Sequence, residues 1–204
     1  MYFMKNFSKI LILLFFCLQC IAKADEIKGF EIEVMSIGDS MLDYMDEDKI
    51  INEMNSKDYS FFYDDDYVTI STWNIRDKFK IYNDVGVILK FGDNQYKIYG
   101  LEGTLYMEED SYIEECYKKQ NEIVDDIKNL LNLDNKGDTW FVDKNNLPEE
   151  VLSTKYTDFE LNGGGVIRVV CSEIKKGAKK FNDRNILSVI INSSTFYKYL
   201  LNRN

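Results

Sequence analysis

The residues from Ser111 to Leu131 carry the most regular pattern in the chain and constrain its fold more than any other stretch. Ser111 and Glu114 form an S-x-x-E capping box, in which each side chain satisfies a free amide of the first helical turn. Side chains that recur at the spacing of one helix face are Ile113, Cys116, Tyr117, Gln120, Ile123, Val124, Ile127, Leu130 and Leu131. The pattern predicts a long amphipathic helix that starts at Ser111 and packs on a sheet.

Strand patterns dominate the sequence on both sides of this helix. Alternation of apolar and polar residues predicts strands at 30–34, 60–63, 67–73, 85–91, 96–107, 159–161, 166–174 and 186–191. Two short helical patterns occupy 41–54, and Ser193 or Ser194 caps a last helix. The stretch 132–155 indicates a polar connection, although it contains Trp140-Phe141-Val142. Because strand runs and helix runs are segregated, we expect an α+β fold, with an antiparallel sheet and the long helix on one face.

The N-terminal segment has the features of an export signal. Lys5 and Lys9 precede an apolar run that starts at Ile10 and leads to an A-x-A cleavage motif ending at Ala24. The run is too short for a permanent membrane span, which needs about 20 apolar residues. We therefore expect cleavage before Asp25, which leaves one domain over 25–204, with no transmembrane segment, in the periplasm or outside the cell.

Charge and composition exclude several classes of function for the exported part. Residues 1–24 contain three lysines and no acidic residue, so their removal changes the net charge from −10 to −13. Such an acidic chain lacks the basic face that nucleic acid requires. Histidine is absent from all 204 residues, which excludes His-based catalytic triads, His general bases and His-ligated zinc.

Two cysteines, Cys116 and Cys171, remain after cleavage. Cys116 shares the apolar face of the predicted helix, and Cys171 has the same phase as Ile167 and Val169 on its strand. An exported domain enters an oxidising compartment, where two such thiols form a disulfide. We expect a bond between Cys116 and Cys171 that ties the helix to the sheet, and two buried free thiols are the alternative.

Several local strings resemble a group of small exported proteins of unknown function from AT-rich marine bacteria. The matching strings are MSIGDSMLDYM, YKIYGLEG with IEECYKKQNEI, and VIRVVCSEI with RNILSVII. They cover most of the exported part of the chain. Because the group has no known activity, the resemblance implies export and a single domain, and it assigns no catalytic residue.

The string Gly38-Asp39-Ser40 resembles the opening motif of the SGNH, or GDSL, hydrolases, in which the serine is the nucleophile. That family activates its serine with a histidine, which this chain lacks, and its G-x-N-D block is also missing. Lys49 is a conceivable base, but no spacing pairs it with Ser40. We favour a helix start instead, in which Asp39 or Ser40 accepts a hydrogen bond from the first amides and Gly38 permits a sharp turn.

Charged clusters provide weaker candidates for a site. Residues 132–138 resemble a calcium loop by their glycine, but Lys136 stands at a ligand position and Asp143 replaces the closing glutamate, so an ordinary polar turn is favoured. The acidic runs at 46–48 and 64–66 suit helix caps and exposed turns better than a cation site. The basic cluster, which either forms a solvated loop or meets an anionic partner, contains Lys175, Lys176, Lys179, Lys180 and Arg184.

No catalytic constellation emerges, and the sequence predicts neither a metal nor a cofactor. Our leading hypothesis is a non-catalytic interaction or binding module that presents a sheet or groove to a protein or another component of the cell envelope. A hydrolase that uses Ser40 is the alternative from the enzyme class. A third possibility is a small-ligand binder with an aromatic pocket, although core packing also explains the aromatic residues Phe61, Phe62, Tyr63, Tyr67 and Trp73.

Overall fold

The computed structural model describes residues 27–56, 61–63, 65–108, 111–131, 137–143, 147–178 and 183–203. The predicted export signal and its cleavage site at Ala24 and Asp25 lie outside these residues. Within the described part of the chain, no helix has both the length and the apolar character that crossing a membrane demands.

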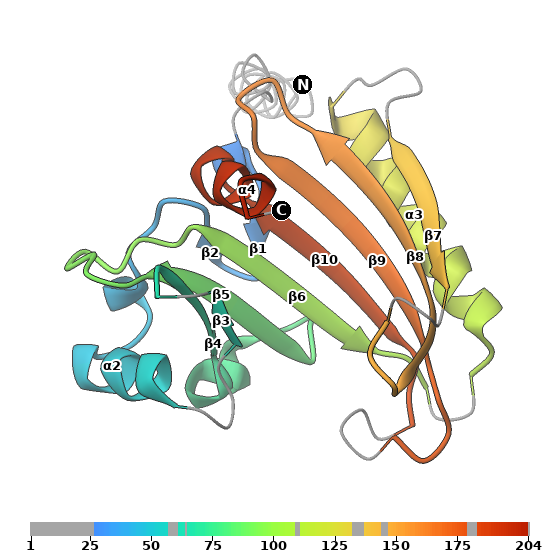
Figure 1. The fold of residues 1–204 in the computed structure, drawn as a ribbon, viewed down its shortest axis with the longest axis horizontal. Coiled ribbons are helices and arrows are strands. Elements are labelled where there is room, and N and C mark those ends of the chain that lie inside the picture. The colour runs from blue at the N-terminus through green and yellow to red at the C-terminus, as the bar shows by residue number, and fades with distance from the viewer. Residues whose placement is uncertain are drawn as a thin grey trace, which may run out of the picture.

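An antiparallel sheet organises the fold, and eight strands form it within the described residues, in the order β3-β4-β5-β6-β10-β9-β8-β7 (Figure 1). The strands are β3 (Phe61–Tyr63), β4 (Tyr67–Ser71), β5 (Asp84–Lys90), β6 (Gly100–Tyr106), β7 (Asp138–Asp143), β8 (Val151–Glu160), β9 (Val166–Ile174) and β10 (Ile186–Asn192). The last strand, β10, lies between β6 and β9 and joins two series of neighbouring strands. The predicted α+β fold is confirmed.

Helices and a small hairpin surround the sheet. They are η2 (Ile27–Gly29), the hairpin strands β1 (Glu31–Ile32) and β2 (Met35–Ser36), η3 (Met41–Asp43), α2 (Glu47–Asn55), η4 (Trp73–Lys78), α3 (Ile113–Leu131) and α4 (Ser194–Leu201). The β1-β2 hairpin, η3 and α2 cover one face of the sheet at β4 to β6, whereas α3 covers the same face at β9 and β10. We call this the core face.

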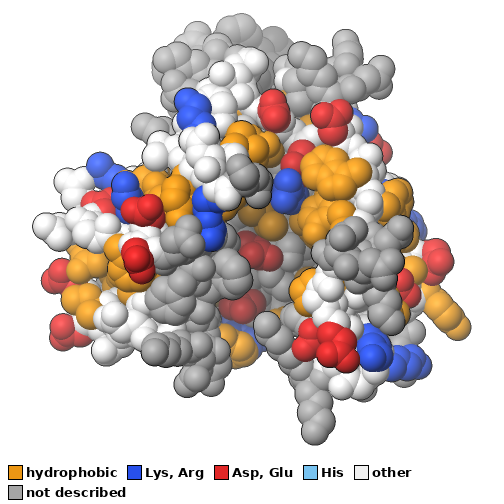
Figure 2. All heavy atoms as spheres, in the orientation of Figure 1, with side chains coloured by type: hydrophobic (Ala, Val, Ile, Leu, Met, Phe, Trp, Pro, Cys, Tyr) orange, Lys and Arg blue, Asp and Glu red, His pale blue; other side chains and the backbone are white. Residues whose placement is uncertain are grey.

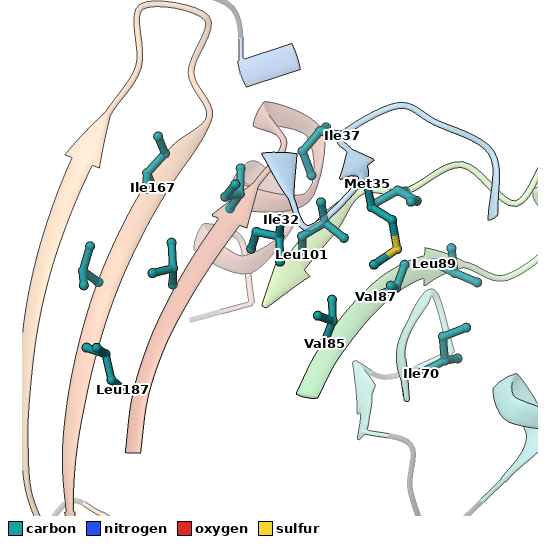
Figure 3. Packing of buried hydrophobic residues seen from close by; sticks show 14 of the residues in the cluster. Ile32, Met35, Ile37, Ile70, Val85, Val87, Leu89, Leu101, Ile167 and Leu187 are labelled. Carbon is teal, nitrogen blue, oxygen red and sulfur yellow. The ribbon is translucent and has the colours of Figure 1, made fainter. Parts of the chain in front are cut away.

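The core face is closed by apolar side chains from both layers. Figure 3 shows Ile32 and Met35 of the small hairpin pointing toward Val87 and Leu101 of the sheet, and all four are 1% exposed or less. The alternation predicted for β5 places Val87 on this face and leaves its neighbours on the opposite face. Burial of this cluster is the main favourable contribution to folding.

The long helix and its disulfide agree with the prediction. Cys116 of α3 and Cys171 of β9 are bonded, with their Cα atoms 6.1 Å apart, and both residues are fully buried. One turn later on the same helix face, Gln120 is also fully buried, and its side-chain amide donates hydrogen bonds of 2.9 and 3.0 Å to the carbonyls of Lys155 and Val169. A covalent bond and a polar bridge therefore attach α3 to the sheet.

Three local predictions are wrong. The strand expected at 30–34 is broken, because Glu33 adopts a left-handed φ of 59° and the chain turns back into β2. The stretch expected to be a polar connection contains the strand β7 and the start of β8, which extends from Val151 rather than from 159. The predicted capping box of Ser111 and Glu114 is absent. The helix begins at Ile113, and the Ser111 hydroxyl is buried without a hydrogen-bond partner, so it does not accept the amide hydrogen bond that a capping box requires.

Candidate site on the open face of the sheet

Among the described residues, α4 covers one end of the sheet face opposite the core face, and no helix covers the middle of that face. Phe196 of α4 is 1% exposed and packs on Tyr67 and Ile88, with Tyr99 and Tyr199 beside them. We call the uncovered remainder the open face. Figure 2 looks onto it and shows a hollow in its centre, with acidic side chains on the floor and hydrophobic side chains over β8 and β9.

The strand register identifies the side chains that share the open face. One row runs through Ser71, Gly86, Glu102, Ile190, Arg168 and Asp158. The next row runs through Asp84, Thr104, Ser188, Val170, Tyr156 and Trp140. Two carboxylates and three hydroxyl-bearing residues therefore lie close together over β4, β5, β6 and β10, and β9 separates them from an aromatic region on β7 and β8.

Asp84 and Glu102 have unusual electrostatics. Burial raises the pKa of Glu102, and the nearby charge of Asp84 raises it further, against the opposing effect of a hydrogen bond from Ser188. Burial also raises the pKa of Asp84, although the Val85 amide donates to its carboxylate at 2.9 Å and the charge of Arg76 opposes the rise. Among the described residues, neither carboxylate lies within ion-pair distance of a basic side chain.

An aromatic region forms one side of the open face. Trp140 and Tyr156 stack with ring centroids 5.7 Å apart and planes at 19°. The guanidinium of Arg168 lies 5.5 and 5.2 Å from these two ring centroids and donates two hydrogen bonds of 2.7 Å to Asp158. These bonds raise the pKa of Arg168, so its guanidinium keeps its charge beside the two rings. Trp140 remains 37% exposed, which leaves ring surface for a ligand.

The predicted role of Ser40 as a helix cap is confirmed. Its hydroxyl oxygen accepts the Leu42 amide at 3.2 Å at the start of η3, and its proton is donated to the carbonyl of Gln95 at 2.7 Å. Asp39 instead accepts hydrogen bonds from the amide of Ser36 at 2.9 Å and the hydroxyl of Tyr44 at 2.7 Å. The Ser40 proton thus points to a main-chain carbonyl rather than to a general base, so this arrangement does not activate the serine.

The acidic runs have local structural roles where they are described. Asp46 holds the cap position before α2, but its side chain makes no capping hydrogen bond and instead lies 3.3 Å from Lys49, so the predicted capping role is wrong here. Glu47 accepts a hydrogen bond of 2.9 Å from the hydroxyl of Tyr96. Asp65 and Asp66 are exposed in the β3-β4 turn. Most of the calcium-like stretch, 132–136, lies outside the described residues. Elsewhere in the described chain, no group of three or more acidic or cysteine side chains is placed to hold a metal ion.

Neither the basic cluster nor the aromatic group predicted from the sequence forms a site among the described residues. Lys175 and Lys176 are exposed, whereas Lys179 and Lys180 lie outside the described residues. Tyr67 is buried beneath α4, which agrees with core packing. Trp73 is 52% exposed and stacks on Arg76, whose guanidinium carbon is 4.4 Å from the ring centroid. These two aromatic residues therefore do not form one groove, and the side chains of 61–63 are not described.

Comparisons with known proteins assign no family. No family model, curated protein or solved structure matches this chain. The resemblance to exported proteins of marine bacteria therefore stays a prediction.

The sequence did not single out the residues of the open face. Asp84 and Glu102 occupy polar positions in alternating strands, and such positions are equally typical of a solvated sheet face. The residues that pair with Asp84 and Glu102 on the neighbouring strands could have indicated a site. They are small or carry hydroxyl groups or are apolar, and none of them is a lysine that could pair with either carboxylate. That signal becomes readable only after the strand order is known.

Proposed function

We propose that this protein is an exported, non-catalytic binding module of the cell envelope and that the hollow of its open face binds a ligand carrying a positively charged amine. The observation that carries the proposal is the position of Asp84 and Glu102, which lie two residues apart in register on the open face and lack an ion-pair partner within the described chain. A ligand ammonium group would supply that partner.

The energetics favour a cation in this position. Both carboxyl groups have a raised pKa because burial makes their charged forms unfavourable. A positive charge beside them stabilises the charged forms, and attraction is stronger in a partly desolvated hollow than in water. The net charge of −10 for the whole chain also favours the approach of a cation and opposes that of an anion.

The neighbouring groups define the rest of the ligand. Ser188 and Thr104 place their hydroxyl oxygens 3.4 Å apart next to Glu102, and each can donate to or accept from a polar ligand group. Trp140 lies four strands from Glu102 in the sheet, about 19 Å at a strand spacing of about 4.8 Å, so its exposed ring surface suits a distant apolar or planar part of a long, extended ligand. Lysine-containing peptides and polyamines have this combination of ammonium groups and apolar methylene chains. The disulfide supports the exported location, since such bonds persist in oxidising compartments.

Isothermal titration calorimetry with spermidine and with a lysine-rich peptide tests the proposal. We expect binding at neutral pH and low ionic strength, and a loss of affinity of about tenfold or more in Glu102→Gln and in Asp84→Asn. Asp125→Asn is the matched control, because it removes the same charge from the exposed side of α3, where Asp125 pairs with Lys128 at 3.8 Å. Its affinity should stay within about twofold of the wild-type value.

Three results would contradict the proposal. Equal losses in Asp125→Asn and Glu102→Gln would show that only the overall charge attracts the amine. Failure of the wild-type protein to bind either probe would remove the cation as the ligand class. Turnover of a glycoside or ester that disappears in Glu102→Gln or in Ser40→Ala would show that the protein is an enzyme.

A further inference from the structure

The side chain of Glu33 accepts three long-range hydrogen bonds from one segment of the described chain. Its carboxylate accepts the amides of Lys80 at 2.9 Å, Ile81 at 2.7 Å and Tyr82 at 2.8 Å, so three consecutive main-chain donors converge on one side chain. Glu33 itself lies in the β1-β2 turn with a φ of 59°, a left-handed conformation that is unfavourable for a residue with a side chain. The three hydrogen bonds offset that local cost.

The segment that Glu33 holds leads directly to the hollow. After Tyr82, the amide of Asn83 donates to the Thr104 carbonyl at 2.9 Å, and its side-chain oxygen accepts the Tyr106 amide at 2.8 Å. The next residue is Asp84, the first residue of β5. Residues 80–82 are therefore fixed by Glu33 on one side, and the chain that follows them is fixed by β6 on the other.

The connection that includes η4 and leads to β5 also contains a basic residue that acts on Asp84. Arg76 of η4 lies a few residues before the held segment, and its charge opposes the rise in the pKa of Asp84. The ring of Tyr82 also lies against Gly103 of β6, where an added Cβ would approach ring atoms to 2.7 Å. The pairing of β5 with β6 sets the position of Asp84 relative to Glu102, whereas residues 80–82 connect Asp84 to the η4 segment that carries Arg76.

We propose that Glu33 is a positioning residue for the hollow: its carboxylate fixes residues 80–82 and thereby sets the place of Arg76 relative to Asp84, which determines the electrostatic environment of Asp84. The inference rests on the proposed function for its consequence in ligand binding, while the positioning itself can be measured without a ligand. Burial alone would raise the pKa of Glu33, but the three amides and the charge of Lys80 together lower it, so the ionised form is the one that binds the segment.

Glu33→Gly is the informative variant, because glycine adopts a positive φ readily and the substitution removes the carboxylate without straining the turn. We expect amide hydrogen exchange at 80–82 to accelerate by about tenfold or more. We also expect the pKa of Asp84, followed by NMR titration, to rise further, because the charge of Arg76 would oppose its rise less. Glu31→Gln is the matched control, since Glu31 is exposed on the same hairpin, and it should change neither measurement.

Chemical rescue separates positioning from a general loss of structure. Acetate provides a free carboxylate, and in the Glu33→Gly protein it should slow exchange at 80–82 and restore the pKa of Asp84, whereas chloride at the same ionic strength should not. Unchanged exchange in Glu33→Gly, or an unchanged Asp84 pKa despite faster exchange, would overturn the inference. If the wild-type protein binds no amine while these two measurements behave as expected, the proposed function fails and the positioning role of Glu33 stands.

Discussion

Reduction of the bond between Cys116 and Cys171 should lower the stability of the fold by an amount that follows from chain entropy. The bond closes a loop of 55 residues. In the loop-closure treatment, opening a loop of this length raises the entropy of the unfolded chain enough to destabilise the folded state by about 4 kcal/mol. For a domain of this size, that loss lowers the melting temperature by roughly 10 °C.

Urea unfolding followed by tryptophan fluorescence, with and without a phosphine reductant, measures this loss directly. Cys116→Ala/Cys171→Ala is the control, because its stability should be low in both conditions and insensitive to the reductant. Alkylation of the unreduced, denatured protein without residues 1–24, which contain Cys17 and Cys20, should add no label, since the sulfurs of Cys116 and Cys171 are bonded. A loss of less than about 1 kcal/mol on complete reduction would refute the entropic reasoning, and two added labels would refute the bond itself.

Three further substitutions test the polar contacts. Glu102→Gln removes a carboxyl group whose pKa is raised in the folded state, so the stability of the wild-type protein falls as the pH rises from the ordinary pKa through the raised one. In urea unfolding, the variant should therefore equal the wild type in acid and be more stable at neutral pH, by about 1.4 kcal/mol per unit of pKa shift. Gln120→Met keeps the volume but removes two buried hydrogen bonds, and calorimetry should show a loss of about 2 kcal/mol; an unchanged melting temperature would show that these bonds contribute nothing. Ser40→Ala should cost about 1 kcal/mol in urea unfolding because η3 loses its cap, whereas Ser40→Asp should be tolerated; equal losses in both would argue against a capping role.

The strong periodic elements were predictable because their patterns coincide with burial. The helix face that contains Cys116 and Gln120 is the face that packs on the sheet, and the alternation of β5 and β9 places their apolar residues on the core face. The phase of Cys116 and Cys171, together with the predicted export to an oxidising compartment, was therefore enough to predict the disulfide. Local periodicity carries this information because each of these elements has one clearly buried side.

The failures occur where distant contacts override a local pattern. The alternation around Glu33 is that of a strand, yet three amides from residues 80–82 hold this residue in a turn. Ser111 and Glu114 have the spacing of a capping box, but the carbonyl of Ser111 accepts a hydrogen bond from Asn185 and its hydroxyl is buried. No local rule contains these partners, because they lie tens of residues away in the sequence.

The candidate site was hidden for a related reason. Glu102 comes next to Asp84 only through the pairing of β5 with β6, and it receives a hydrogen bond from Ser188 only because β10 inserts beside β6. The sequence shows three separate polar residues on alternating strands. Strand order and register, which local patterns do not determine, turn them into one cluster.

The place of β10 in the sheet determines when the chain can complete its fold. Until Ile186–Asn192 is available, β6 and β9 each present an edge of unpaired main-chain groups, and such edges associate with other chains. A chain that emerges N-terminus first must therefore pass through a state with two exposed strand edges, and its final pairing joins residues about 80 positions apart, which is intrinsically slow. Chain synthesis interrupted before Ile186 would yield a sheet in two unjoined parts, without the Ser188 side of the hollow, and would leave a substrate for chaperones and proteases in place of a folded domain.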